Sequence, residues 1–342
     1  MIALFPSVAI KFLRMYGKNM AADLLFARFA DSLAKVIRDK PELFDQEVAA
    51  FVQALETRKL SDQGKAHAIS PADLPGLTAV GVQVAQAILA REKNDLMYIE
   101  RMATSAVPAV RCCAAMALGE FGSVYPEQVV PLAYRLAKDS AWEVREFVAN
   151  AFDERMTETQ GEFVYRLMQQ WVQDPDENVR RVPTNALMRY GRRFPDHVLA
   201  LMASLRHDSS MYVRKNVCFC LGVLGLERHP ALGYPSAENP ERVLNLMHDW
   251  IQDDDEGTRW IVAETLGRSW SKSHSQEALR LLHILAADPR KRVRSVVLAS
   301  LRTLIKRELE AKNQIQTWFQ DDNSLVQELA RKVLTPRPSV AS

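Results

Sequence analysis

Hydrophobic and polar positions along the chain repeat at an interval of about 35 residues. The clearest marker is an arginine that follows valine in most copies, in the motifs AVPAVR, SAWEVR, DENVR, SMYVR, EGTR and KRVR, which end at Arg111, Arg145, Arg180, Arg214, Arg259 and Arg294. Successive markers lie 34, 35, 34, 45 and 35 residues apart, and a seventh copy, DDNSLVQ, places Gln327 in the same position 33 residues later. Periods of this size are typical of stacked helical repeats, in which each helix pair buries its apolar face against its neighbours.

Three columns of apolar residues, numbered from the marker, predict the buried stripe of the second helix in each pair. The column before the marker and the columns three and seven residues after it contain Val110, Val144, Val179, Val213, Thr258 and Val293; Ala114, Val148, Pro183, Val217, Val262 and Val297; and Leu118, Phe152, Leu187, Leu221, Leu266 and Leu301. Residues three and four positions apart share one face of a helix. An Asp six residues before the marker, as at Asp139 and Asp174, suits a turn and the N-cap of the second helix.

The periodic pattern, with Asp in the turn and Arg at the start of the second helix, resembles HEAT repeats over roughly residues 80–335. The resemblance implies an all-α fold, a HEAT-like helical-repeat solenoid or α-α superhelix, which we expect over residues 77–335. Residues 1–76 are expected to form an N-terminal helical cap with a connecting loop, and residues 336–342 a disordered tail. The marker arginine is then expected to be chiefly a strut within and between repeats, with phosphate contact as the alternative reading.

Two departures from the repeat interrupt this regular pattern. The stretch GLERHPALGYPSAENP, residues 225–240, is a Gly/Pro-rich insertion between repeats. Pro183 stands where a helix interior is expected, which predicts a kink or a late helix start. Residues 1–58 are helical by pattern but outside the period.

A second stripe on the second helix of each pair is formed by the residues three positions before, one position after and five positions after the marker. These residues are variable and polar, so we expect the stripe to face solvent. One copy carries Glu177, Arg181 and Asn185 on this stripe, and another carries Lys291, Ser295 and Ala299. Aromatic residues interrupt the stripe elsewhere, as in the pairs Trp142 and Glu146, Lys215 and Phe219, and Glu256 and Trp260. An aromatic side chain beside a carboxylate on one helix face suggests a ligand. The alternative is that Trp142 and Phe219 pack under a loop or against the N-terminal helices.

Basic residues cluster in the centre of the chain. The segment ENVRRVPTNALMRYGRR carries Arg180, Arg181, Arg189, Arg192 and Arg193, and Lys215 follows one repeat later. Clustered cations with interleaved aromatic residues are the pattern expected for binding a nucleic-acid backbone. The alternative is an ordinary solvated face.

Composition narrows the class of protein without naming a partner. The chain has 342 residues, with 44 Lys and Arg against 42 Asp and Glu, so only the distribution of charge can indicate a partner. No apolar run is long enough for a bilayer span and no signal peptide is recognisable, so a cytoplasmic location is expected. The four cysteines, Cys112, Cys113, Cys218 and Cys220, fit neither a disulfide framework nor a zinc site and are expected to be buried thiols. No metal or organic cofactor is expected, because the seven His are scattered and no phosphate-binding glycine motif occurs.

The stretches DPDENVRR, SSMYVRKNVCFCLGVLG and NPERVLNLMHDWIQDDDEGTRWIVAETLG resemble bacterial HEAT-like-repeat DNA alkylation-repair glycosylases of the AlkC and AlkD type. The N-terminal ELFDQEVAAFVQALETRKL is similar to an AlkC-type segment. The resemblance implies a protein that grips double-stranded DNA in a basic concave groove and excises positively charged alkylated purines. A monomer is expected. It implies that Glu146 is the catalytic carboxylate, with Glu in place of the family's Asp, and that Trp142 and Phe219 contact the lesion or sugar, with Phe in place of a second Trp.

The basic cluster and Lys215 are the residues expected to bind the DNA backbone, and the resemblance implies that Arg180 or Arg181 is the phosphate-holding arginine. A cationic purine is already a good leaving group, so the expected task of the carboxylate is to stabilise the oxocarbenium-like sugar and to position a water. A non-catalytic nucleic-acid-binding solenoid and a protein-binding scaffold are the alternatives that the sequence leaves open.

Overall fold

The computed structural model describes residues 20–61, 69, 73–91, 95–226, 239–268, 271 and 274–335. Within these ranges the chain forms α-helices joined by turns and short 3₁₀ or π segments, and no strand occurs in them. The prediction of an all-α repeat solenoid is confirmed. The expectations for residues 336–342, and for nearly all of the insertion at 225–240, fall outside the described residues.

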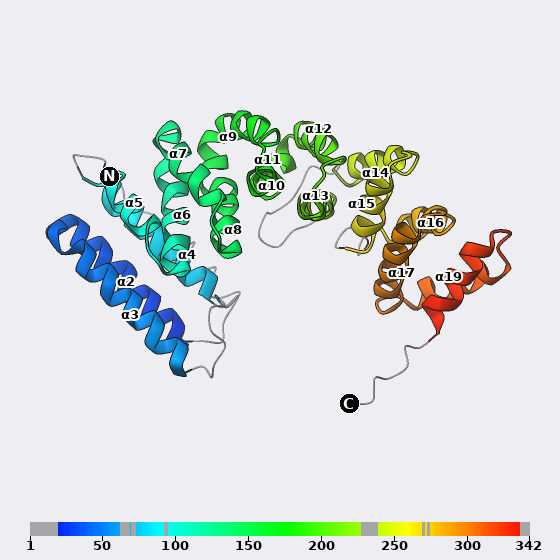
Figure 1. The fold of residues 1–342 in the computed structure, drawn as a ribbon, viewed down its shortest axis with the longest axis horizontal. Helices are drawn as coiled ribbons and strands as arrows, with labels where there is room; N and C mark the ends of the chain where they lie inside the picture. Colours follow the sequence, from blue (N-terminus) through cyan, green and yellow to red (C-terminus); the bar gives the residue numbers. More distant parts are fainter. Residues whose placement is uncertain are drawn as a thin grey trace. The chain divides into compact units, whose positions relative to one another are not determined.

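The contacts divide the chain into two compact units, residues 1–168 and 169–342. Helices of the first unit are α2 Met20–Asp39, η1 Pro41–Leu43, α3 Phe44–Ser61, α4 Leu74–Leu89, α5 Met97–Ala103, α6 Pro108–Gly122, α7 Pro126–Ala137 and α8 Trp142–Ala151. The N-terminal helices α2 and α3 form a hairpin, in which the ring centroids of Phe29 and Phe51 lie 4.9 Å apart. In this unit α2 packs on α4, α4 on α6, and α6 on α8, so the hairpin extends the stack of second helices (Figure 1).

A π-turn, η3 Phe152–Met156, joins α8 directly to α9 Thr157–Trp171, which crosses the boundary between the units. The remaining helices are α10 Glu177–Ala186, α11 Met188–Arg193, α12 Pro195–Leu205, α13 Met211–Leu224, α14 Asn239–Trp250, α15 Glu256–Leu266, α16 Ser275–Ala286, α17 Lys291–Ile305, α18 Leu309–Thr317, η5 Trp318–Gln320 and α19 Ser324–Leu334. Within the second unit α10, α13, α15 and α17 pack in succession as one layer, and α12, α14 and α16 lie on the other side of it (Figure 1). We call this row of second helices the second-helix layer.

The three predicted core columns are buried in every copy. Val110, Val179 and Val293 have no exposed surface, and neither does Thr258, the polar residue of that column. Leu118 and Phe152, seven residues after their markers, are each 2% exposed. Burial of such side chains stabilises the fold by roughly 1.5 to 3 kcal/mol each relative to exposure. The apolar columns therefore identify the packing face correctly.

The marker side chain makes the same hydrogen bond in all seven copies. It donates to the backbone carbonyl six residues earlier, in the pairs Arg111 and Ser105, Arg145 and Asp139, Arg180 and Asp174, Arg214 and Asp208, Arg259 and Asp253, Arg294 and Asp288, and Gln327 and Asp321. Gln327 replaces arginine but keeps the bond, at 2.7 Å. This contact closes the turn inside each repeat, and it explains why a long hydrogen-bond donor recurs at this position of each repeat.

The Asp that recurs six residues before the marker also has a structural role, which differs in part from the predicted turn and N-cap. Each Asp accepts the N–H of the residue two positions later, as Asp139 does from Ala141 and Asp208 does from Ser210, both at 2.8 Å. That later residue is the N-cap of the second helix, as for Ala141 and Ser210. The Asp therefore forms the turn, as expected, but it does not cap the helix.

Two local expectations from proline and loop signals need correction. α10 does not start late, because it begins at Glu177 and contains Pro183 in its interior. The helical backbone is interrupted four residues further on, at Leu187, where φ is −113°, and α11 follows. The connecting loop is also shorter than expected at its C-terminal end, since α4 begins at Leu74 and has Pro75 in its first turn.

Candidate nucleic-acid interface

Trp142 and Glu146 lie one turn apart on α8, with Trp142 as the first residue of the helix. The Trp142 side chain is 59% exposed and Glu146 is half-buried. One repeat earlier, the positions equivalent to Trp142 and Glu146 are occupied by Pro108, which is half-buried, and Cys112, which is buried. A ring with this exposure is not packed beneath a loop or against the N-terminal helices in the part of the chain that the structure describes. Trp142 is therefore available to a ligand beside a carboxylate on the same helix face.

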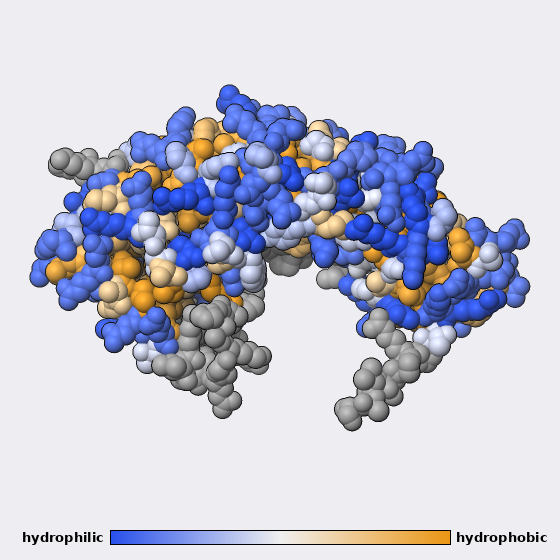
Figure 2. Space-filling view, in the orientation of Figure 1, coloured by the Kyte–Doolittle hydropathy of each residue, from blue (hydrophilic) through white to orange (hydrophobic). Residues whose placement is uncertain are grey.

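A second pair lies on α13 of the second unit. Lys215 is exposed, and Phe219, one turn later on the same face, is 41% exposed. Hydrophilic residues cover much of the face shown in Figure 2, with apolar patches between them. Each unit thus presents one exposed aromatic side chain on the stripe that the sequence singled out, one beside a carboxylate and the other beside a lysine.

Arg180 is engaged inside the protein. Its Nε donates to Asp208 Oδ2 at 2.6 Å and its Nη2 to Asp208 Oδ1 at 3.0 Å. Its Nη1 donates to the carbonyls of Asp174 and Pro175 at 2.8 and 2.9 Å. The hydrogen bond to the Asp208 carboxylate raises the pKa of Arg180. These contacts are those of a strut, which is the reading favoured from the sequence.

The other arginines of the central cluster differ widely in accessibility. Arg181 is 1% exposed, with its guanidinium carbon 5.1 Å from the centroid of the Tyr212 ring on α13. Arg192 is 4% exposed, and burial lowers its pKa. Arg189 is half-buried, and Arg193 is exposed. Of the six cations expected to bind the DNA backbone, Arg193 and Lys215 are the exposed ones.

The expectation that the polar stripe faces solvent is wrong for part of α10, where Glu177 is exposed but the other two residues are not, and for part of α15. Arg181 and Asn185 are buried on α10, and Trp260 is 6% exposed on α15. The reason on α10 is packing: Tyr212, from the next helix in the layer, covers the Arg181 guanidinium. A long amphipathic side chain can fill such a position beside an aromatic ring.

Two further cations lie on the second-helix layer and were not among the sequence candidates. Lys291 and Arg292, in the first turn of α17, are exposed. Neither takes part in an ion pair among the residues that the structure describes. Glu264, an acidic residue of the same layer, pairs with Arg268 at 2.7 Å. Both residues belong to the motif KRVR and directly precede Val293 and the marker Arg294, so this run of basic residues is the sequence signal for them.

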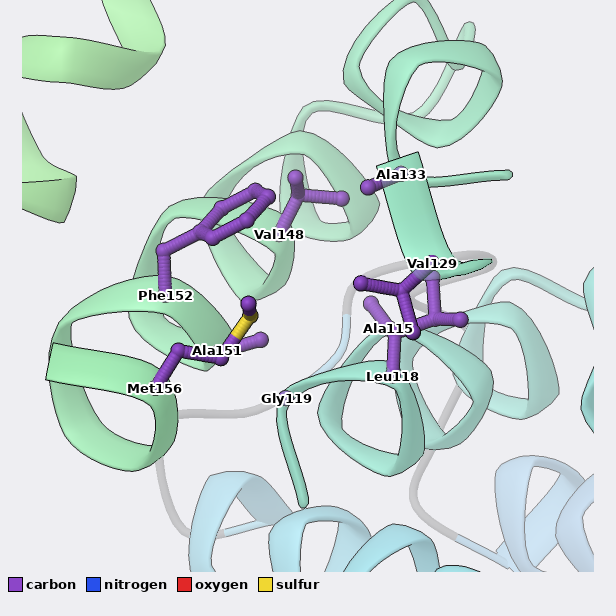
Figure 3. A pocket seen from close by; sticks show the side chains of 9 residues that line it. All are labelled: Ala115, Leu118, Gly119, Val129, Ala133, Val148, Ala151, Phe152 and Met156. Carbon is purple, nitrogen blue, oxygen red and sulfur yellow. The ribbon is translucent and has the colours of Figure 1, made fainter. Parts of the chain in front are cut away.

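A small void in the first unit is lined only by apolar residues (Figure 3). Its lining includes Ala115 of α6, Val129 of α7, Val148 of α8, and Phe152 and Met156 of the π-turn. The volume is about 10 Å³, at the lower limit for a single water. Without polar groups it stays dry, and it is a packing defect of the repeat core that cannot receive a nucleobase.

The described residues place no group of three or more His, Cys, Asp or Glu where a metal ion could be held. The four cysteines are buried, as expected. Burial raises the pKa of the Cys112, Cys113 and Cys218 thiols well above the ordinary range. Thiolate chemistry is therefore disfavoured at these sites. In the part of the chain that the structure covers, no helix is both long and apolar enough to cross a bilayer.

Comparison with known proteins agrees with the fold. Residues 198–302, which contain α13 to α16 with most of α12 and α17, match the family model described as HEAT repeats. No curated protein matches the chain in sequence. Among solved structures, the chain is similar to the Pseudomonas fluorescens alkylpurine DNA glycosylase AlkC bound to DNA containing an abasic site analog, with 16% identity, a TM-score of 0.43, and 82% of this chain and 69% of that chain covered.

Other similar structures are helical-repeat or engineered proteins. An engineered protein shares 15% identity with a TM-score of 0.33 over 96% of this chain and 91% of its own. A Kap121p mutant shares 14% identity with a TM-score of 0.39 over 95% of this chain and 32% of its own. With TM-scores this low, none of these similarities assigns a function to this chain.

Proposed function

We propose that this HEAT-like repeat protein binds double-stranded DNA through its second helices and excises positively charged alkylated purines. The observation that carries the proposal is the exposed Trp142, 59% accessible, one helical turn from Glu146 on the same face of α8. A large ring left open to solvent beside a carboxylate suits a ligand that is both planar and cationic. An N3- or N7-alkylated purine in DNA has both properties.

In this proposal Glu146 is the catalytic carboxylate. Cleavage of the glycosidic bond moves the bond electrons onto the departing purine, which neutralises its positive charge. Positive charge then develops on the sugar, where a carboxylate stabilises it and orients the attacking water. Trp142 contributes a cation–π attraction to the lesion or sugar, worth roughly 0.5 to 2 kcal/mol. Phe219, in the second unit, is assigned the same kind of DNA contact. No metal or organic cofactor is required.

Phosphate binding is assigned to the exposed cations Arg193, Lys215, Lys291 and Arg292. Arg180 and Arg181 hold repeats together instead, because the first is bound to Asp208 and the second is 1% exposed. Half-buried Arg189 and buried Arg192 are at most secondary contacts. Each phosphate that a cation neutralises releases counterions, so affinity for duplex DNA should fall steeply as salt rises. We propose that the protein acts as a monomer in the cytoplasm.

The proposal is tested by base release from methylated duplex DNA, measured beside binding of the same duplex at two salt concentrations. Release together with salt-sensitive binding supports a glycosylase. Salt-sensitive binding without release indicates a non-catalytic DNA-binding solenoid. Absence of binding at low salt indicates a protein-binding scaffold.

A further inference from the structure

Three aromatic rings meet at the junction between α11 and α12, away from the stripe of Trp142 and Phe219. The Phe194 ring lies 4.9 Å from the Tyr190 ring and 5.8 Å from the His197 ring, measured between centroids. The Phe194 and His197 planes are inclined by only 17°. We call Tyr190, Phe194 and His197 the aromatic ledge, and it lies entirely within the second unit.

The ledge is held in a fixed geometry by its own contacts. Tyr190 is 4% exposed, and its hydroxyl oxygen lies 3.1 Å from His197 Nδ1, within hydrogen-bond distance. Phe194 is the N-cap residue of α12, with a non-helical backbone, and Pro195 fixes the first position of the helix. The buried phenol thus anchors the imidazole while the junction holds the Phe194 ring. A ring restrained in this way loses little entropy when it binds a planar partner.

The outer part of the ledge is open. Phe194 is 48% exposed and His197 is exposed. The charge beside it is positive: Arg193, the preceding residue, is exposed and takes part in no ion pair among the described residues. The nearby carboxylate of Asp196 is neutralised by Arg242, whose Nη1 lies 2.5 and 2.6 Å from its two oxygens. A flat aromatic surface therefore stands next to an uncompensated cation.

We propose that the aromatic ledge stacks an unpaired nucleobase of a nucleic-acid strand, with Arg193 contacting the adjoining phosphate. The proposal rests on nucleic acid being the partner, as in the proposed function. It assigns a further aromatic site and an unpaired strand, and it shares Arg193 with the proposed duplex-binding surface. A stacked base inside an intact duplex cannot reach such a ledge, whereas a frayed end or a single strand can. Stacking is tolerant of base identity because every base has a π-face. The ledge thus binds single-stranded nucleic acid with little sequence preference.

The test uses the full-length protein and a single strand of about eight nucleotides with a central 2-aminopurine, a size within the usual range for single-strand sites. We expect the wild-type protein to quench the 2-aminopurine fluorescence on binding. Phe194→Leu keeps an apolar side chain but removes the ring. It should weaken single-strand binding by roughly 5- to 150-fold, the range expected for loss of one stacked base, and abolish the quenching. Phe194→Tyr restores the ring and should restore both.

Arg193→Gln should lower the salt dependence of single-strand binding by about 0.7 in the log–log slope. Circular dichroism of each variant checks the fold. We expect unchanged spectra, because the exposed part of Phe194 contributes little to packing. Equal binding and quenching by wild type and Phe194→Leu would overturn the ledge proposal, even if duplex binding is intact. Conversely, if the wild-type protein quenches the 2-aminopurine fluorescence but does not bind duplex DNA, the proposed function alone is overturned. Loss of the quenching when a short aromatic peptide is added at a concentration equal to that of the strand would assign the ledge to proteins and overturn the nucleic-acid assignment.

Discussion

Arg180 and Asp208 form a two-bond ion pair across a junction between successive repeats, with Nε–Oδ2 and Nη2–Oδ1 distances of 2.6 and 3.0 Å. Arg111 holds Asp139 in the same way, and Arg259 reaches Asp288 at 3.1 Å. Each of these arginines also closes the turn of its own repeat through a carbonyl. The recurring arginine is thus explained by the needs of a stacked repeat, in which neighbouring units must be fastened to one another.

Arg180→Ala should therefore act on stability. It leaves the Asp208 side chain, 5% exposed, without its cationic partner, and breaking such a pair costs about 3 to 5 kcal/mol. Hydrogen exchange at the turn between α12 and α13 should speed up locally, and chemical denaturation should begin earlier. Lys312→Ala, at an exposed position of α18, is the control and should change stability by no more than about 0.5 kcal/mol. Equal stability of the two variants would remove the strut interpretation.

Gly257 and Gly222 offer a matched pair of substitutions in two second helices. A Cβ on Gly257 would lie 1.5 Å from Nη1 of Arg214, whereas a Cβ on Gly222 would find its nearest neighbour, Arg268 Cβ, at 3.7 Å. Gly257→Ala must displace the guanidinium at the end of the flexible Arg214 side chain, so we expect it to lack the stabilisation that alanine brings to a helix. Gly222→Ala should instead stabilise the helix by about 0.5 to 1 kcal/mol. Thermal unfolding of both variants measures the difference, and a stabilised Gly257→Ala protein would contradict the close approach of Arg214.

The carboxylate of Asp288 should make the stability of the fold depend on pH in the acidic range. Burial alone would raise its pKa, but hydrogen bonds from the side chain and backbone of Arg290 and from Arg259 outweigh it, and the net pKa is lowered. A carboxyl whose pKa is lower when folded stabilises the protein above its unfolded pKa of about 3.9, and that contribution is lost as the pH falls through the folded value.

Asp288→Asn should therefore be less stable than wild type near pH 7, and the difference between the two should shrink as the pH falls below about 4. Denaturant unfolding across this range makes the comparison. Asp322→Asn removes a carboxylate at an exposed position and should show a small difference at every pH. A stability gap for Asp288→Asn that stays constant down to about pH 2 would show that the charge of Asp288 is not what stabilises the junction.

Salt dependence distinguishes the cations that contact DNA from those that hold repeats together. Lys215→Gln and Lys291→Gln each remove one proposed phosphate contact and should lower the slope of log affinity against log salt by about 0.9 for duplex DNA. Lys312→Gln removes a cation from a first helix and should leave the slope unchanged. Slopes that are equal for all three variants would mean that the second-helix layer is not the DNA-binding surface.

The repeat architecture could be predicted because each copy must satisfy the same packing and hydrogen-bond needs. Val110 and its equivalents are buried in every repeat, and even Gln327 makes the bond that the marker arginines make. A period in the sequence records such repeated needs directly.

The accessibility of individual side chains on the polar stripe could not be predicted in the same way. Arg181 and Lys215 occupy one column, yet Arg181 is buried because Tyr212 of the next helix covers it, while Lys215 is exposed. Their difference depends on which side chain of a neighbouring helix lies above the column, and the column itself contains no information about that. The aromatic ledge could not be predicted for the same reason, because its rings come together only where α11 and α12 join.

The measurement that tests the central claim most directly is release of alkylated purines from methylated duplex DNA by the wild-type protein and by Glu146→Gln. The substitution keeps the size and hydrogen-bonding capacity of the side chain and removes its charge. We predict that wild type releases the modified bases, and that Glu146→Gln binds duplex DNA with near-normal affinity but loses release. Equal rates of release by both proteins, or no release by wild type despite binding, would contradict the account.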